Sequence, residues 1–379
     1  MAYIYADNAA TTRLSDTAFD AMKPFMLAEY GNASTLYKLG RSAHKAVENA
    51  RGVFAKGINA YPAEIYFTSG GTESDNWAIK GTAHRLASCG KKHIVTDNIE
   101  HHAVLNSAKA LEREGFEVTY VSADNNGLVR AEDVAAAIRP DTAMVSVMFA
   151  NNELGTIQPV AEIGSICRSE GVLFHCDAVQ AAGILPIDVK QMNIDLLSIS
   201  AHKFHGPKGV GVMYARRGCA PETYIDGGEQ ERGHRAGTEN VAGIVGAAAA
   251  FAEAMSERDE KAERLCAMRD EIQSGLMKIP GSQVNGVTAP RLPGTLNMSF
   301  DGIDGQSLIF ELDLKGLAAS SGSACASGSV DPSHVLLALG LPYKLAHGSL
   351  RLSLGKYNTS DEAEMIIRIV SDTVAELRG

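Results

Sequence analysis

Between residues 60 and 215, short apolar runs alternate with segments that have the spacing of amphipathic helices. The apolar runs have the length and residue types of strands. They read EIYFT, HIVTD, VTYVS, AMVSVMFA, VLFHCD, LLSISA and GVGVMYA. Strands that are apolar along nearly their whole length indicate a sheet covered by helices on both faces. The pattern therefore predicts an α/β fold with a mostly parallel central sheet.

The composition changes near the end of this region. From Glu239 to about Lys278 the chain is first rich in alanine and then charged, and the charged stretch SERDEKAERLCAMRDEI has opposite charges spaced for i,i+4 pairing on a long exposed helix. The short strand candidates TLNMSF, LAAS and SLRLSL follow, with helical segments between them. We therefore expect a large domain over residues 12–253 and a smaller α+β domain over residues 254–379, packed with residues 1–11.

The net charge narrows the choice of partners. Lys plus Arg number 35 against 45 Asp plus Glu, a net charge of −10 that repels nucleic acid and anionic membrane surfaces. The sequence shows no secretory leader and no run of about 18 apolar residues, so we expect a soluble cytoplasmic protein. Its six cysteines have neither C-x-x-C nor zinc-finger spacing. Reduced thiols and no metal site are the expectation.

One predicted strand, LLSISA, runs directly into His202 and Lys203 and then into a Gly/Pro-rich turn. The ends of strands in α/β sheets are where ligands bind. A lysine with a lowered pKa can form a Schiff base with an aldehyde, and pyridoxal 5′-phosphate (PLP) is the commonest such cofactor. On this segment alone, a solvated surface lysine is the more common alternative.

Two further segments supply what a PLP site needs. Asp177 ends the run VLFHCD, and Gln180 lies where we expect a helix to begin. The carboxylate could hold a pyridine nitrogen protonated and the amide could reach the ring's phenolic oxygen, although Asp177 could equally cap the helix. Gly70, Gly71 and Thr72 precede another helical pattern, where bare amides and a hydroxyl suit a phosphate. Together with the lysine, these elements predict a PLP site.

At this point the chain resembles the NifS-type cysteine desulfurases, which are class V aminotransferase-like PLP enzymes of fold type I. The matching motifs extend over essentially the whole chain and are DNAATT, TSGGTESDN, EHHAV, ANNELGT, HCDAVQ, SAHKFHGPKGVG, RAGTEN, SSGSACASGS and RLSLG. The resemblance implies that PLP forms a Schiff base with Lys203. It also implies that L-cysteine is converted to L-alanine.

The resemblance implies a role for each matching residue. The cofactor-binding residues are Gly71, Thr72, Asn152, Asp177, Gln180, Ser200, His202 and, from a second subunit, Thr238. His101 would stack on the ring and move protons, whereas a histidine at a strand end is more often structural. Asn32 and Arg351 would bind the substrate carboxylate, although an arginine on an alternating strand usually faces solvent. The role of Thr238 makes a homodimer part of the site.

Cys325 determines the expected reaction. It lies in SSGSACASGS, a run of small residues that buries little apolar surface and is expected to be mobile. A structural cysteine normally has apolar neighbours, as Cys176 has in VLFHCD. We therefore expect the Cys325 thiolate to attack the substrate sulfur and to carry it as a persulfide. In the family, the persulfide passes to an iron–sulfur scaffold protein or another sulfur acceptor.

Three alternatives stay open at this point. An aminotransferase of the same fold has no use for a reactive thiol, whereas a selenocysteine lyase is harder to distinguish. A silent sulfur-trafficking scaffold would have no chemical need for the predicted set of site residues. The sequence departs from many relatives at Ala33, where they have a proline that would make this loop more rigid. It also ends at AELRG, without the longer C-terminal extension that some relatives use for scaffold docking, so the sequence does not identify the acceptor.

Overall fold

The computed structural model describes residues 3–321 and 331–379. Its largest sheet has the strand order β2-β8-β7-β6-β5-β3-β4. The strands are β2 (Ile65–Thr68), β3 (His93–Asp97), β4 (Glu117–Val121), β5 (Thr142–Ser146), β6 (Leu173–Asp177), β7 (Leu196–Ser200) and β8 (Gly211–Ala215). Only β8 runs against its neighbours in this sheet. All seven predicted runs form this sheet, and the predicted α/β fold is confirmed.

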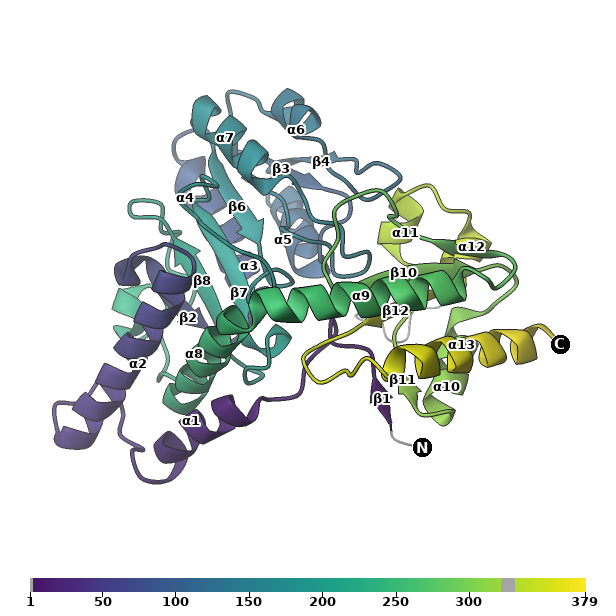
Figure 1. Cartoon of the computed structure of the whole chain (residues 1–379). Helices are drawn as coiled ribbons and strands as arrows, with labels where there is room; N and C mark the ends of the chain where they lie inside the picture. Colours follow the sequence, from purple (N-terminus) through teal and green to yellow (C-terminus); the bar gives the residue numbers. More distant parts are fainter. Residues whose placement is uncertain (1–2, 322–330) are drawn as a thin grey trace.

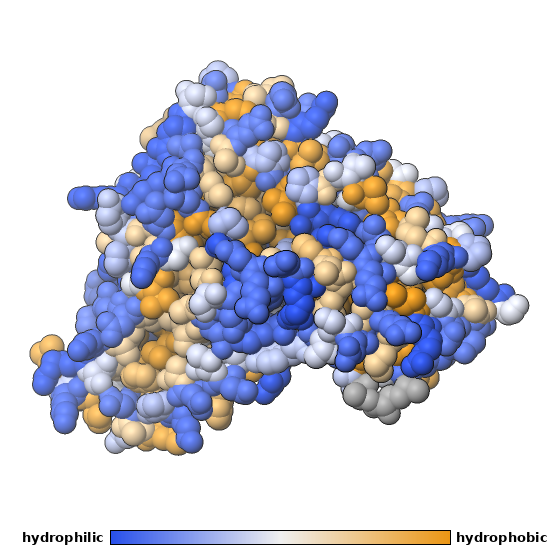
Figure 2. Space-filling view, viewed as in Figure 1, coloured by the Kyte–Doolittle hydropathy of each residue, from blue (hydrophilic) through white to orange (hydrophobic). Residues whose placement is uncertain are grey.

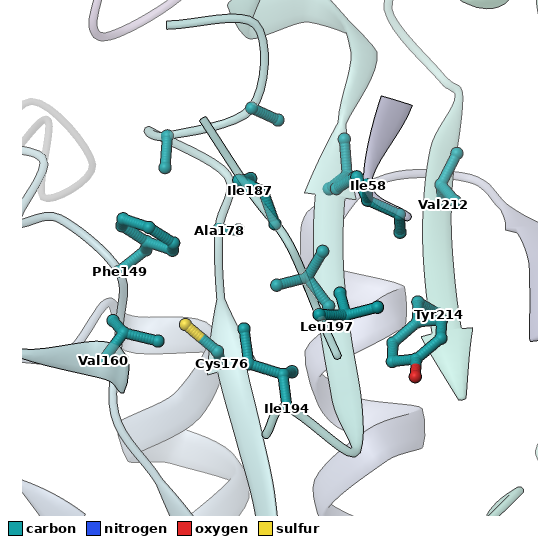
Figure 3. Close-up of a cluster of buried hydrophobic side chains, with 14 of the residues drawn as sticks. Ile58, Phe149, Val160, Cys176, Ala178, Ile187, Ile194, Leu197, Val212 and Tyr214 are labelled. Atoms are coloured by element: carbon teal, nitrogen blue, oxygen red, sulfur yellow. The ribbon is translucent and has the colours of Figure 1, made fainter. Parts of the chain in front are cut away.

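Helices cover both faces of the sheet because the central strands are apolar on both sides. One core cluster joins the sheet to α1 (Asp16–Leu27), α2 (Lys38–Gly57), α6 (Ala131–Ala137), α7 (Val160–Glu170) and α8 (Val241–Ser256). Figure 3 shows part of this cluster, with Cys176 and Leu197 among other apolar side chains. The cluster on the other face takes its residues from a π-helical turn (Trp77–Gly81), α4 (Thr82–Ala87) and α5 (His102–Arg113). The π turn joins α4 to α3 (Gly71–Asn76).

A second unit with its own apolar core follows in the chain. Its antiparallel sheet has the order β12-β10-β9. The elements are α9 (Arg258–Leu276), β9 (Ser282–Val284), β10 (Thr295–Phe300), α10 (Gly305–Leu314), β11 (Leu317–Ala318), α11 (His334–Ala338), α12 (Tyr343–His347), β12 (Ser349–Ser353) and α13 (Glu362–Arg378). β1 (Ile4–Tyr5) pairs with β11, so the N-terminal residues pack with this unit (Figure 1).

The long helix expected over SERDEKAERLCAMRDEI is present as α9, and the alanine-rich stretch before it forms the separate helix α8. Glu257 separates α8 from α9, and the alanine-rich α8 is largely buried against α1 and α2. Helix α8 packs into the core of the large unit, whereas α9 packs into the core of the smaller unit. The two helices therefore take different directions (Figure 1). Arginines in α9 pair with the adjacent aspartates rather than at i,i+4. The domain boundary at residues 253 and 254 stays a prediction, and it falls within α8.

The parallel strands direct their carboxyl ends towards the smaller unit, and the predicted site residues follow those ends. Asp177 ends β6, and Lys203 follows β7. Among the described helices, none combines the length and the apolar composition that a membrane span requires.

Candidate active site

A cavity of about 250 Å³ lies at the carboxyl ends of the parallel strands. Its lining is made of Ala9, Ala10, Gly71, Thr72, Asp75, His101, Met148, Ala150, Asn152, Asp177, Val179, Gln180, Ser200, His202, Lys203 and Arg351. The structure therefore brings together most of the residues that the sequence singled out.

Lys203 reaches the cavity from a short 3₁₀ turn (Ala201–Lys203) directly after β7. All of β7 is buried, which fixes the point at which the chain leaves the sheet. The Nζ of Lys203 donates hydrogen bonds to the backbone oxygens of Ala9 at 2.5 Å and Ala10 at 2.8 Å. Thr12 donates from its amide and its hydroxyl to the carbonyl of His202. The N-terminal segment thus holds the amine at the cavity wall, a contact that local sequence patterns do not predict.

Asp177 and Gln180 lie beside this amine. Burial raises the pKa of Asp177 to about 6, against the opposing effects of the hydrogen bond from Val179 and the charge of Lys203. Gln180 Nε2 donates to the carbonyl of Ala9 at 3.0 Å. The helix expected to begin here is wrong, because turns follow Asp177 and Gly183 adopts a left-handed conformation with φ +74°. Asp177 Oδ1 instead accepts the Val179 amide at 2.8 Å and forms an Asx turn.

The turn from β2 into α3 forms a small cradle. Gly71 is the first residue of α3, as the sequence predicts, and a Cβ there would lie 2.6 Å from Val179 Cγ2. A Cβ on Gly70 would occupy open space, with only the Ser200 hydroxyl within 4 Å. The amides and the Thr72 hydroxyl at this helix start are suited to an anion. The cradle therefore has the room and the donors for a phosphate.

His202 adds a neutral side chain to the cradle. Its Nδ1 lies 3.1 Å from the Thr11 hydroxyl. Burial and the charges of Lys203 and Lys208 lower the pKa of His202 to about 4. The ring is therefore uncharged at neutral pH and can exchange hydrogen bonds with a phosphate without titrating.

His101 is the N-cap of α5 and lines the cavity. Its Nδ1 accepts the Ala103 amide at 3.1 Å, so in the neutral ring the proton lies on Nε2. Burial, the charge of Lys203 and the neighbouring His102 and His334 lower the pKa of His101 to about 4. The ring is therefore neutral, with one fixed tautomer.

Arg351 lies on β12, where its guanidinium is buried rather than exposed to solvent. It donates to the carbonyl of Asn152 at 3.0 Å and to Asp7 Oδ1 at 2.7 Å. Its Nε has no hydrogen-bond partner in the described part of the chain. The sequence reasoning missed Asp7, which orients this guanidinium. A buried arginine with a spare donor beside a cavity is suited to a substrate carboxylate.

Three predicted site residues are not brought into this cavity. Asn32 and Thr238 are exposed, and the Oδ1 of Asn32 accepts the Ser34 amide at 2.9 Å. Cys325 lies outside the described residues. The described residues on either side of it are anchored near the cavity, because Ser320 pairs with the backbone of Arg351 and Ser333 donates to Glu153. The roles of all three residues stay predictions.

The aminotransferase class-V family model matches residues 4–366, and the chain belongs to this family. The cysteine desulfurase IscS of Methanosarcina thermophila is 50% identical over 376 residues, 99% of this chain and 93% of that protein. A cysteine desulfurase of a Nostoc species is 44% identical over 380 residues, 100% of this chain and 94% of that protein.

Two solved structures extend this similarity to the fold. A NifS-like protein superposes with a TM-score of 0.93 at 40% identity, covering 99% of this chain and 100% of that one. The structure of SspA in complex with cysteine gives a TM-score of 0.83 at 36% identity, covering 94% of this chain and 100% of that one. The fold and the family expected from the sequence are confirmed.

Proposed function

We propose that this protein is a PLP-dependent cysteine desulfurase that converts L-cysteine to L-alanine and passes the sulfur to Cys325 as a persulfide. The observation that carries the proposal is the convergence of Lys203, Asp177 and the Gly70–Thr72 turn on one cavity. That convergence occurs in a chain that is half identical, over nearly its whole length, to a cysteine desulfurase.

The cavity fits PLP by its chemistry. Lys203 offers an amine for the cofactor aldehyde, and the buried carboxyl group of Asp177 suits a protonated pyridine nitrogen. Gln180 offers an amide for the phenolic oxygen, and Asn152 supplies a further contact. The phosphate would be held by Gly71, Thr72, Ser200, His202 and the partner subunit's Thr238. When bound, PLP supplies an electron sink that weakens the bonds of the substrate's α-carbon.

The chain's own residues then bind the substrate and move its protons. Arg351, assisted by Asn32, binds the carboxylate of L-cysteine and fixes the amino acid relative to the cavity wall. The Nζ of Lys203 takes the proton from Cα, because it is the amine at the wall of the cavity. His101 carries a proton on Nε2 and can donate it without first being charged.

The sulfur step is a displacement at the substrate Sγ. The Cys325 thiolate forms a bond to that sulfur while the substrate Cβ–Sγ bond breaks, and the electron pair stays on carbon, which takes a proton to become the alanine methyl group. Cys325 is left as a persulfide and no external oxidant is needed. Cys325 is four residues beyond Ser321, a chain reach of about 14 Å from a segment that pairs with Arg351. An iron–sulfur scaffold protein or another sulfur acceptor then takes the terminal sulfur.

We infer that the site is completed in a homodimer. Thr238 is exposed and lies outside its own chain's cavity, as a residue that serves a partner would. The surface near the end of α1 and the start of α2 exposes large apolar side chains (Figure 2). They include Met26, Leu27, Tyr30, Leu36 and Tyr37. A cytoplasmic location suits the free thiols of the five cysteines in the described residues.

The test compares the wild type with Cys325→Ser, measuring alanine and sulfide released from L-cysteine with dithiothreitol while recording the visible absorption of bound PLP. We expect the variant to lose turnover but to keep the PLP band and its change on adding cysteine. Cys89→Ser is the matched control, because Cys89 is an exposed free cysteine that does not line the cavity. Turnover by Cys325→Ser at the wild-type rate would overturn the persulfide step.

A further inference from the structure

Four carboxyl groups are buried together beneath the cavity, on Asp75, Asp97, Glu100 and Asp177. They come from α3, the end of β3, the segment before α5 and the end of β6. Burial raises the pKa of Glu100, and the negative charges of the other three carboxyl groups raise it further. In the described part of the chain, no arginine or lysine forms an ion pair with any of the four. Burying several unpaired charges is costly, so protons must neutralise part of this cluster.

Asp97 and Glu100 face each other within hydrogen-bond reach. Asp97 Oδ1 already accepts the Ile99 amide at 2.9 Å. Asp97 Oδ2 and both carboxyl oxygens of Glu100 are buried and have no close, well-aligned donor in residues 3–321 and 331–379, and the amides of Glu100 and Met148 approach the two carboxyl groups only at longer range. Two ionised carboxylates have only acceptors, so a hydrogen bond between them requires a proton on one of the two.

We propose that Glu100 is a protonated carboxylic acid that donates its O–H to an ionised Asp97, and that this shared proton positions His101. Asp97 is the acceptor because its other oxygen already holds a backbone amide. Neither residue touches the substrate, so both are positioning residues. The existence of the shared proton does not depend on the proposed function. Its effect on catalysis rests on the proposed function.

The backbone between Asp97 and Glu100 connects the hydrogen bond of their side chains to the cavity. Asn151 Nδ2 donates to the carbonyl of Ile99 at 2.9 Å, and His334 Nε2 lies 3.1 Å from the carbonyl of Glu100. With the Asp97 side chain holding the Ile99 amide, this short turn is fixed on both sides. The next residue is His101, whose ring lines the cavity. Loss of the Asp97–Glu100 bond would therefore loosen the segment that presents this ring.

The other groups around the pair disfavour a charge on Glu100. Asp177 and Asp75 face it with negative charge from β6 and α3, and the Cys176 thiol is buried in the same region. His175 lies 3.6 Å from Asp75, but burial lowers the pKa of His175 to about 3. Its two ring nitrogens contact the hydroxyls of Ser146 and Ser198, so it supplies no compensating positive charge. Lys203 acts on Asp177, as described above.

Infrared spectroscopy on the purified full-length protein tests the proton directly. At pH 8 the exposed carboxyl groups are ionised, so the carbonyl stretch of a protonated carboxylic acid reports buried acids alone. We expect Glu100→Gln to remove one such band from the wild-type spectrum. Glu64→Gln is the matched control, because Glu64 is also buried but its carboxyl oxygens accept the amides of Tyr61 and Arg217. An unchanged acid band in Glu100→Gln would overturn the proposal.

A pair of substitutions tests the positioning role. Glu100→Gln keeps an N–H donor for Asp97, so we expect its kcat to stay within about threefold of the wild type. Glu100→Ala leaves Asp97 buried without that donor, and we expect kcat to fall about tenfold or more. Equal losses in both variants would overturn the proposal, because the charge of Glu100 would then be the property required. If the wild type releases no alanine, the proposed function fails while the infrared result still stands.

Discussion

Arg351 shows how one side chain is prepared for a ligand by residues far away in the chain. Its guanidinium is buried, and Asp7 and the Asn152 carbonyl fix its plane. A lysine keeps the positive charge but cannot offer two parallel donors. We therefore expect Arg351→Lys to raise the KM for L-cysteine about tenfold and to lower kcat less. Steady-state kinetics checks this, with Arg368→Lys on the exposed face of α13 as control; an unchanged KM would contradict a carboxylate role.

His101 is prepared differently, by its protonation state. Because its pKa is lowered to about 4, the ring stays neutral from about pH 5.5 to 9 and does not titrate near the ordinary histidine value. We expect His101→Gln to lower kcat about 100-fold, since a general acid–base group is lost. A loss of kcat/KM near pH 6.5 that is present in the wild type and absent in His101→Gln would be the titration of His101. We expect no such loss. Such a loss would contradict the lowered pKa.

At the scale of elements, the ends of the strands place the site and the glycines near them set its shape. Gly211 begins β8 beside the turn that leads into α3. A Cβ at Gly211 would lie 2.5 Å from the Thr68 hydroxyl and 2.6 Å from the backbone of Gly70. We expect Gly211→Ala to displace that turn and to weaken PLP binding about tenfold, as measured by titrating cofactor-free protein with PLP.

The control for this prediction is a glycine with space around it. Gly52 lies inside α2 and a Cβ there would meet no atom within 4 Å. Gly52→Ala is expected to keep PLP affinity and to stabilise the protein by about 0.5–1 kcal/mol, because alanine loses less backbone entropy in a helix. Thermal unfolding measures this gain. Equal PLP affinities in both alanine variants would mean that the Gly70 turn does not hold the phosphate.

The sequence patterns predicted the strands well and the turns less well, for a physical reason. A buried strand is a local run of apolar residues, so all seven strands of the large sheet were visible in the sequence. A helix was predicted after Asp177, whereas the structure has turns there. The left-handed conformation of Gly183, which ends any helical path, is visible only in the structure. The bonds from Lys203 to Ala9 and from Arg351 to Asp7 join residues 194 and 344 positions apart. Only tertiary structure creates such contacts, and no local pattern encodes them.

At the scale of the whole molecule, the buried titratable groups fall into two classes with opposite pH dependence. Burial lowers the pKa of four histidines, to about 4 for His101, His202 and His205 and about 3 for His175. Burial raises the pKa of several acids. The raised acids are Asp177 at about 6, Asp97 and Glu153 at about 7, and Asp75 and Glu100 well above their ordinary values. Both classes favour the uncharged forms in the folded state.

The two classes make opposite contributions to the pH dependence of stability, and their pH ranges overlap. Below about pH 6.5 the unfolded chain binds protons that the four folded histidines do not, so unfolding becomes easier as the pH falls towards 4. From about pH 4.5 up to the raised pKa of each folded acid, the folded protein retains protons that the unfolded chain has already lost, so the acids lower stability as the pH rises through that range. Each such proton changes the unfolding free energy by about 1.4 kcal/mol per pH unit.

Chemical denaturation of the cofactor-free protein from pH 4.5 to 9 checks this. Glu153→Gln should remove about one proton from the slope between about pH 4.5 and 7, because Glu153 is buried with a pKa raised to about 7. Above about pH 8 the slope should be the same in this variant as in the wild type, because Glu153 has lost its proton in both the folded and the unfolded state there. A wild-type stability that rises steadily to pH 9 would show that the buried acids are ionised in the folded protein. The shared proton between Asp97 and Glu100 would then be contradicted by a measurement independent of activity.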